Sequence, residues 1–192
     1  MDDFGGKSMS DHILIPDNKV EVFNKVKDSK FYGNISSVKN REQAEDFINM
    51  IKEKYSDAAH NVSAYVIRNN KSPINYSDDD GEPSGSSGPP VLEVIEGRNL
   101  TNTVIVVTRY FGGTKLGIGG LIRAYGNTAR MAIEEAGIKK LNLVYKLSIK
   151  GNYKVIGKIM GQIESFHGKI LETDYNNQGC NVFCLIDPKY YD

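Results

Sequence analysis

Tryptophan is absent from the 192-residue chain, and only two cysteines occur in it. No apolar run approaches the ~18 residues of a membrane-spanning helix, and the first twenty residues carry four aspartates instead of a secretory signal. An excess of either charge is also lacking, because 24 Lys and Arg balance 24 Asp and Glu. We therefore expect a cytoplasmic globular protein that is neither embedded in a membrane nor basic throughout like a histone.

The two cysteines indicate reduced thiols in a protein core. Cys180 and Cys184 are four residues apart in a segment with the pattern of a strand. At ~3.3 Å per residue their Cα atoms would be about 13 Å apart, beyond the ~7 Å that a disulfide allows. No histidine or further cysteine lies close by in the sequence to complete a zinc set. The cysteines thus predict neither a metal site nor a cofactor.

The distribution of apolar residues predicts an α/β (α+β) protein of two domains, built as two-layer sandwiches of helices on sheets. Residues 1–10 are polar and are expected to form a flexible tail. Residues 11–138 alternate between strand and helix patterns, and residues 139–192 follow a β-α-β-β order. Four such elements are half of a split β-α-β sandwich, so we expect the second domain to be incomplete.

Individual elements can be placed from periodicity and capping residues. In the first domain we expect strands at 13–16, 20–26, 31–38, 62–68 and 103–111, and helices at 41–55, 89–97 and 121–136. In the second we expect strands at 141–150, 169–175 and 180–186 and a helix at 155–166. Asn40 is expected to cap the first helix, with Gln43 completing a box-like pair.

A polar loop at residues 77–88 carries four carboxylates and no basic residue: Asp78, Asp79, Asp80 and Glu82. Clustered carboxylates, joined in space by His60, are a pattern that could bind Mg²⁺ or Mn²⁺ or serve in general acid–base chemistry. Equally, aspartates in a turn bond neighbouring backbone amides. Their spacing is not that of an EF-hand, and both interpretations remain open at this point.

A glycine-rich loop between a strand and a helix is the sharper signal. Ten of the nineteen glycines lie between Gly81 and Gly126. The amide groups at a helix N-terminus attract anions, and glycines let an anion approach the backbone. Neither a Walker A motif nor G-x-G-x-x-G is present. The loop therefore predicts an anion site of backbone groups and one lysine, with the candidates Gly112, Gly113, Lys115, Gly117, Gly119 and Gly120.

Basic residues accumulate around this loop. Between Thr103 and Met131 the chain has four cations and no carboxylate, namely Arg109, Lys115, Arg123 and Arg130. Arg123, Asn127 and Arg130 are four and three residues apart and share one helix face. This face is either an ordinary solvated surface or a phosphate-binding one. Arg109 follows a buried strand, so we expect it to pair with Asp79, Asp80 or Glu82.

Several motifs, in order along the chain, resemble the signature of the Impact/YigZ family. They are Ala-His-Asn at 59–61, Asp-Asp-Gly-Glu-Pro-Ser-Gly at 79–85, Val-Thr-Arg-Tyr-Phe-Gly-Gly at 107–113 and Gly-Gly-Leu-Ile-Arg-Ala-Tyr-Gly at 119–126. The resemblance covers residues 20–137 and fits the bacterial branch. One departure is Val62, where bacterial members often have cysteine.

This resemblance implies a first domain similar to the second domain of a small-subunit ribosomal protein, with a left-handed β-α-β crossover. It implies a second, ferredoxin-like domain similar to the last domain of elongation factor G, here incomplete. Eukaryotic members act in the starvation (stress) control of translation initiation. For bacterial members a nucleic-acid or ribosome-binding role is the usual inference.

Two classes of function follow. The favoured one is a binding module that contacts RNA, the ribosome or a translation factor through the glycine loop and the basic helix face, without DNA specificity or membrane contact. The alternative is a metal- or anion-dependent, hydrolase-type enzyme that uses the acidic loop, His60 and the glycine loop as one cleft. Association of two copies of the chain is left open.

Overall fold

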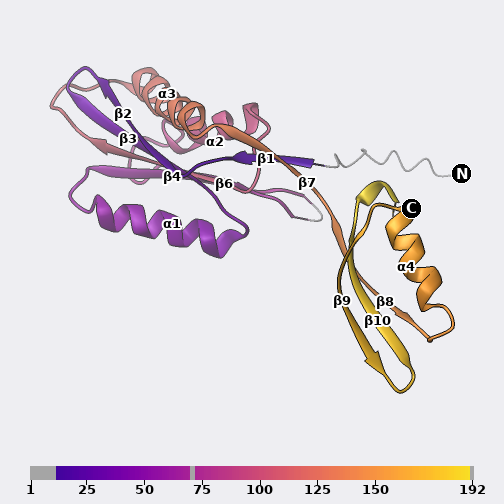
Figure 1. The fold of residues 1–192 in the computed structure, drawn as a ribbon. Coiled ribbons are helices and arrows are strands. Elements are labelled where there is room, and N and C mark those ends of the chain that lie inside the picture. Colours follow the sequence, from indigo (N-terminus) through magenta and orange to yellow (C-terminus); the bar gives the residue numbers. More distant parts are fainter. Residues whose placement is uncertain (1–11, 70–71, 191–192) are drawn as a thin grey trace, which may run out of the picture. The chain divides into compact units, whose positions relative to one another are not determined.

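The computed structural model describes residues 12–69 and 72–190 (Figure 1). The tail expected at residues 1–10 lies outside this described part. The chain separates into two compact units between Lys140 and Leu141. The larger unit is Leu14–Lys140, and the smaller one includes the residues from Leu141 on. No helix in the described residues is both long and apolar enough to cross a membrane.

The larger unit is built on a five-stranded sheet in the order β2-β3-β6-β4-β5. The strands are β2 (Val20–Val26), β3 (Ser29–Ser37), β4 (His60–Ile67), β5 (Ile74–Asp78) and β6 (Thr103–Tyr110). Every neighbouring pair is antiparallel, and β6 is the central strand. Two further strands, β1 (His12–Pro16) and β7 (Ile138–Asn142), form a separate two-stranded ribbon.

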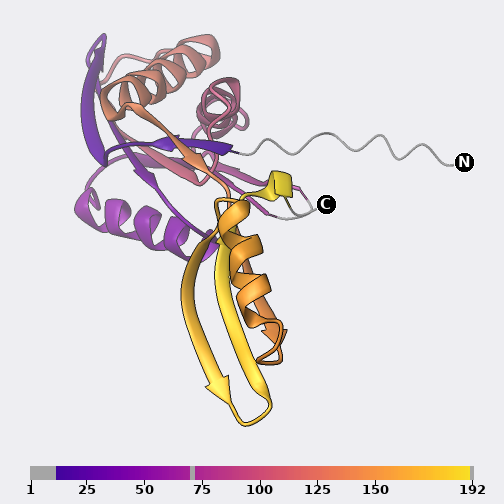
Figure 2. The same cartoon turned by 45° about the vertical axis from the view of Figure 1, so that its right-hand side comes forward.

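Helices cover both faces of this sheet (Figures 1 and 2). On one face Val104 and Val106 pack against α1 (Arg41–Lys54). On the other, Ile105 and Val107 pack against α2 (Gly88–Gly97) and α3 (Ile118–Ala136). The two-layer prediction is therefore wrong for this unit, which has three layers. The reason is that β6 is buried at every position from Thr103 to Arg109, so each face needs a cover.

The first helix begins where the sequence predicts. The backbone N–H of Gln43 donates to Asn40 Oδ1 at 2.9 Å, which confirms Asn40 as the cap of α1. The Gln43 side chain reaches back as expected of a box-like pair, although its oxygen accepts from Lys39 N, at 2.9 Å, and not from Asn40 N. The first contact satisfies an N–H group that the helix itself leaves unpaired, and the second holds the residue that precedes the cap.

The smaller unit has the predicted β-α-β-β order. Its elements are β8 (Tyr145–Gly151), α4 (Ile156–Ser165), β9 (Lys169–Asn176) and β10 (Gly179–Ile186). The antiparallel sheet has the order β8-β10-β9, and α4 packs on one face through Ile163. Cys180 and Cys184 lie in this core, both buried and both free, as predicted for reduced thiols. This unit has two layers.

Candidate functional site

The glycine loop between β6 and α3 is fastened to the turn that joins β2 and β3. A Cβ atom on Gly112 would lie 2.0 Å from the backbone oxygen of Asp28, so only glycine fits there. Thr114 Oγ1 donates a hydrogen bond to Asp28 Oδ2 at 2.7 Å. The first part of the loop thus has a structural function: two backbone segments meet closely there.

The second part of the loop leads into α3 without a side-chain cap. Gly117 is the N-cap residue and has a φ of +73°, a conformation that favours glycine. Ile118 is the first helical residue, and Gly119 and Gly120 follow it, so two of the three residues in the first turn have no side chain to screen its amide groups. Lys115 is exposed beside this helix start. The predicted combination of open backbone and one lysine is therefore present at residues 115–120.

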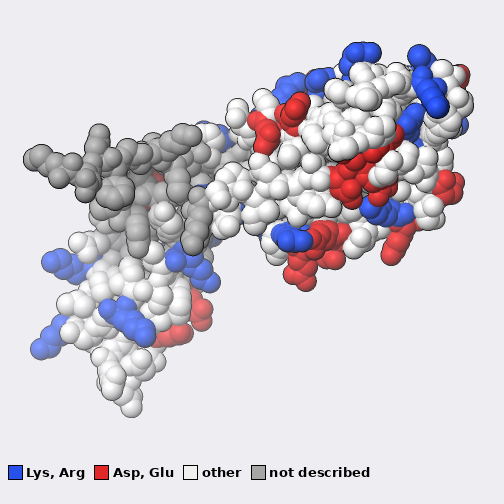
Figure 3. Space-filling model, turned by 180° about the vertical axis from the view of Figure 1, so that it is seen from behind, with Lys and Arg blue, Asp and Glu red and all other residues white. Residues whose placement is uncertain are grey.

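The basic face of α3 is solvent-exposed. Arg123, Asn127 and Arg130 are all exposed, and Arg130 donates a hydrogen bond to the Asn127 side chain. In the part of the chain that the structure describes, Lys115, Arg123 and Arg130 form no ion pair with a carboxylate. Lys and Arg groups stand along the upper edge of the larger unit in Figure 3, the edge at which α3 lies in Figure 1.

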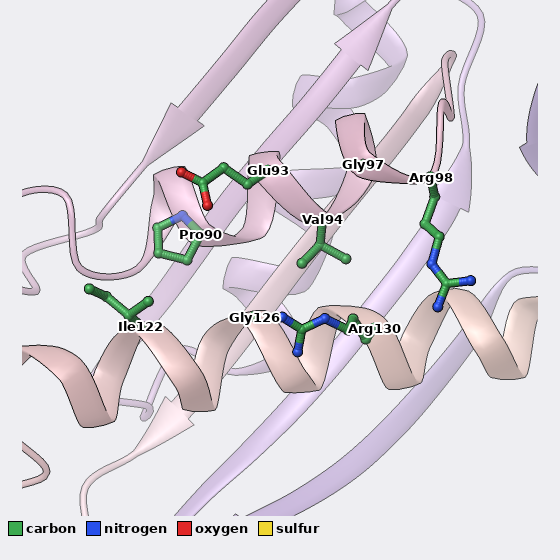
Figure 4. Close-up of a pocket in the computed structure, with 8 residues that line it drawn as sticks. All are labelled: Pro90, Glu93, Val94, Gly97, Arg98, Ile122, Gly126 and Arg130. Atoms are coloured by element: carbon green, nitrogen blue, oxygen red, sulfur yellow. The ribbon is translucent and has the colours of Figure 1, made fainter.

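A groove of about 330 Å³ between α2 and α3 adjoins this face. Figure 4 shows Pro90, Glu93 and Val94 of α2 opposite Ile122, Gly126 and Arg130 of α3, with Gly97 and Arg98 at the end of α2. The sequence does not predict this groove, because the two helices that form it are paired only in the folded chain.

Arg109 does not belong to the exposed face. It is 5% exposed, and its Nη1 lies 2.6 Å from Oε1 of Glu82, which is 8% exposed. The predicted pairing of Arg109 is thereby confirmed, with Glu82 as the partner. The Tyr125 hydroxyl donates to the same Glu82 oxygen at 2.7 Å. Burial, reinforced by this carboxylate, raises the pKa of Tyr125 far above its ordinary value.

His60 and Asp80 lie beside the buried pair. His60 Nδ1 is 2.8 Å from the backbone oxygen of Asp80, and His60 Nε2 is 3.9 Å from Glu82 Oε2. The Asp80 carboxylate accepts from Lys52 Nζ at 2.7 Å and from Asn61 N at 2.6 Å. Burial would raise the pKa of Asp80, but these two donors outweigh it and lower the pKa. His60, Asp80, Glu82 and Arg109 are thus brought together.

The Asp79 side chain lies away from this group and caps the N-terminus of α2. Its Oδ1 accepts from Ser87 N, Ser87 Oγ and Gly88 N, and its Oδ2 accepts from Gly85 N, all at 2.7–3.0 Å. These bonds lower the pKa of Asp79, although burial acts in the opposite direction. The interpretation of the loop as a turn whose aspartates bond backbone amides is confirmed for this residue.

The carboxylates of the loop are therefore largely engaged with partners in the chain. Among the described residues, no group of three or more His, Cys, Asp or Glu side chains is arranged to hold a metal ion. Glu82 and Arg109 do converge, as the one-cleft hypothesis requires, whereas Asp79 is directed to α2.

An aromatic cluster on the sheet is a second feature that the sequence does not predict. Phe23, Tyr32, Tyr55 and Tyr110 come from β2, β3, the end of α1 and β6, and their neighbouring ring centroids are 5.2–6.4 Å apart. The alternation of apolar and polar residues along β2 was the available signal, since it places Phe23 on the face opposite Val22. Nothing in the sequence shows that four distant segments bring these rings together.

The chain is similar in sequence to known proteins over the antiparallel sheet, its helices and the glycine loop that leads into the basic helix. The model of the Impact N-terminal domain matches residues 27–133. IMPACT family member YvyE of Bacillus subtilis (strain 168) is 40% identical over 151 residues, which are 79% of this chain and 69% of that protein. IMPACT family member YigZ of Escherichia coli (strain K12) is 30% identical over 164 residues, 84% of this chain and 80% of that protein. The chain belongs to the Impact family.

A solved structure supports the mixed α/β fold. The crystal structure of a hypothetical protein matches with a TM-score of 0.72 at 27% identity. The match covers 94% of this chain and 87% of that chain, so both units have counterparts in it.

Proposed function

We propose that this protein is a cytoplasmic, translation-linked binding module that holds RNA by its phosphates on the exposed face of α3 and the adjoining helix start. The observation that carries the proposal is the set of exposed cations Lys115, Arg123 and Arg130, without an ion-pair partner in the described chain. Unpaired surface cations attract phosphates and release counterions, which makes such binding strong at low salt.

The open start of α3 supports the same ligand. Amide groups in its first turn carry a partial positive charge, and Gly119 and Gly120 leave them accessible to phosphate oxygens. Asn127 adds a neutral donor between two arginines of the same face. A phosphate backbone can therefore follow the helix from its N-terminus toward Arg130.

Membership of the Impact family supports the link to translation. The resemblance to this family implies that the partner is RNA, the ribosome or a translation factor. In the larger unit α1 connects β3 to β4 across the central strand β6. We propose that this connection is the crossover of the ribosomal-protein-like fold, and that the β-α-β-β order of the smaller unit is an incomplete ferredoxin-like domain. These assignments favour a binding module over an enzyme.

The test is a charge reversal on the exposed face. Anisotropy of a labelled single-stranded RNA of about 12 nucleotides would be measured for the intact protein and for R123E/R130E. We expect the double reversal to raise the Kd at least tenfold at about 150 mM salt without changing the circular dichroism spectrum. The matched control is K39E/R41E, which alters the net charge equally at two exposed residues on the other side of the sheet, beside α1.

Unchanged affinity in R123E/R130E would contradict the proposal, and so would an equal loss in K39E/R41E. A protein that binds no RNA at any salt concentration would also contradict it. A protein partner, or a small-molecule enzyme centred on His60 and Glu82, would then be the better interpretation.

A further inference from the structure

Two neighbouring rows of side chains cross β2, β3 and β6 on the face that α1 also occupies. Phe23 pairs with Tyr32, and Tyr32 pairs with Thr108, in one row. Lys25 pairs with Lys30, and Lys30 pairs with Tyr110, in the next. Because residues two apart on a strand point to the same side of the sheet, aromatic rings and lysines stand side by side there.

This part of the face is only partly covered by the described elements. Helix α1 packs against β4 and β6, and Tyr55 at its end stacks on Tyr32 with centroids 5.4 Å apart. Beyond Tyr55 the sheet is open, and Phe23 is 50% exposed on β2. The rings meet at angles, 48° between Phe23 and Tyr32 and 84° between Tyr32 and Tyr110, so each exposed ring offers its own apolar face or edge to a planar ligand.

The charges around the rings favour an anion. Lys25 and Lys30 are directly opposite on antiparallel strands, an arrangement of like charges that destabilises a sheet. Within the described residues neither lysine forms an ion pair. The neighbouring acids already have partners: Asp57 accepts from the Tyr110 hydroxyl at 2.6 Å, and Glu21 accepts from Lys54 at 2.5 Å. Asp28, which borders the adjoining hollow, accepts from Thr114 Oγ1 at 2.7 Å.

A hollow of about 310 Å³ lies at the edge of this surface, beside the glycine loop. It is lined by Asp28, Lys30, Tyr32, Tyr110, Phe111 and Gly112. The Phe111 ring is 49% exposed, and the Arg109 guanidinium lies 5.3 Å from its centroid. The volume is at the lower end of small-ligand sites, ~300 Å³, which suits a single nucleobase with part of its sugar.

We propose that this aromatic surface, formed by Phe23, Tyr32, Tyr110 and Phe111 with Lys25 and Lys30, stacks unpaired bases of an RNA strand while the two lysines hold its phosphates. The choice of RNA as ligand rests on the proposed function. Phe23, Tyr32 and Tyr110 lie on the opposite side of the sheet from α3, and Phe111 borders the hollow at the end of β6, beside Arg109. Stacking needs bases that are free of a duplex, so the surface selects single-stranded over double-stranded RNA.

Other occupants fit less well. A quaternary or methylated ammonium group prefers aromatic rings without a cation beside them, and Lys30 lines this hollow. An acidic peptide would match the two lysines but would leave the ring faces without a planar partner. Only a ligand that is both anionic and planar uses the rings and the lysines together.

The absence of tryptophan from the chain provides a direct probe. In F111W the single indole would stand beside the hollow, and stacking of a base would quench its fluorescence. The matched control is Y76W, because Tyr76 is 37% exposed on β5, at the other edge of the same sheet face. We expect single-stranded RNA to quench F111W at least twofold more than Y76W, and a blunt RNA duplex to quench neither.

Affinity measurements complete the test. F111A and F23A, which truncate exposed rings, should each raise the Kd for single-stranded RNA about tenfold and leave duplex binding unchanged. Equal quenching of F111W and Y76W would overturn the proposal. So would quenching of F111W by poly-glutamate but not by RNA, an outcome that would indicate a protein partner.

The two RNA proposals fail in different ways. If RNA binds by anisotropy but does not quench F111W, the stacking surface is wrong and the α3 surface stands. If R123E/R130E binds normally while F111A loses affinity, the α3 surface is wrong and the stacking surface stands.

Discussion

Arg109 Nη1 lies 2.6 Å from Glu82 Oε1, and this buried pair joins the end of the central strand to the acidic loop. The same carboxylate oxygen accepts the Tyr125 hydroxyl from α3 at 2.7 Å. One oxygen atom therefore links a loop, a strand and a helix that are far apart in sequence. The position of the helix that carries the basic face depends on a charge pair beneath it.

Arg109→Ala should lower stability sharply, because it leaves the Glu82 carboxylate buried without its partner. Loss of one member of a buried pair costs about 3–5 kcal/mol, and we expect a large fall in Tm by differential scanning calorimetry. R123A, which removes an exposed arginine, is the control and should melt within about 0.5 kcal/mol of the natural sequence. An R109A protein that melts normally yet loses RNA binding would assign Arg109 to the ligand site instead.

Asp79→Ala should loosen the start of α2. Ser87 at the N-cap makes no side-chain cap bond of its own, and Asp79 supplies the acceptor from eight residues upstream. Loss of a capping carboxylate costs about 0.5–2 kcal/mol, measurable by urea unfolding. Asp46→Ala, on the exposed side of α1, should change the free energy of unfolding far less.

The same residue should contribute to acid sensitivity. The folded pKa of Asp79 is lowered, so its contribution is fully present above the unfolded pKa of about 3.9 and is lost as the pH falls through the folded value. The difference in unfolding free energy between the natural sequence and D79A should therefore be constant from about pH 7 to 5 and shrink below about pH 4. A difference that grows toward low pH would contradict this assignment.

Gly112→Ala should destabilise the larger unit, whereas Gly119→Ala should not. A Cβ atom on Gly112 would collide with the Asp28 backbone, and overpacking of this kind costs about 1–3 kcal/mol. A Cβ atom on Gly119 would meet only the Arg123 side chain, at 3.5 Å, and alanine favours a helix by up to about 1 kcal/mol. Equal Tm values for the two variants would show that the loop does not close on the β2–β3 turn.

The slope of the log association constant against log salt concentration should report how many RNA phosphates contact the α3 surface. In a K25Q/K30Q background only Lys115, Arg123 and Arg130 remain in the two proposed surfaces, and ~0.7 per phosphate gives a log–log slope near −2. Adding R123Q should reduce that slope by about 0.7, as measured by anisotropy across a salt series. A slope that R123Q leaves unchanged would exclude a phosphate contact at that residue.

The sequence predicted most elements of the fold because their patterns are local. The run of buried residues in β6 and the apolar face of α1 each follow from a short stretch of chain. The strand β5 was missed because it is short and lies at the edge of the sheet, with Ile74 and Tyr76 more than a third exposed. Its polar, partly exposed residues look like the loop that follows them.

The site was predictable only in part, and the division has a physical cause. The basic face of α3 depends on helical spacing and could be predicted, whereas the partner of Arg109 depends on how a loop folds over the sheet. Three carboxylates were equally suitable in sequence, and burial beside Tyr125 is what distinguishes Glu82. The aromatic cluster depends on strand order, and no single segment encodes it.

The hydrogen bond from Gly88 N to the Asp79 carboxylate closes residues 79–88 into a ring. By composition this glycine-, serine- and proline-rich stretch resembles a flexible linker, the kind of segment into which epitope tags and protease sites are usually inserted. The hydrogen bonds of Asp79 make this stretch intolerant of insertions. Added residues would separate the carboxylate from the amides that it holds and would release the first turn of α2. Fusion partners and cleavage sites for this protein therefore belong elsewhere in the chain.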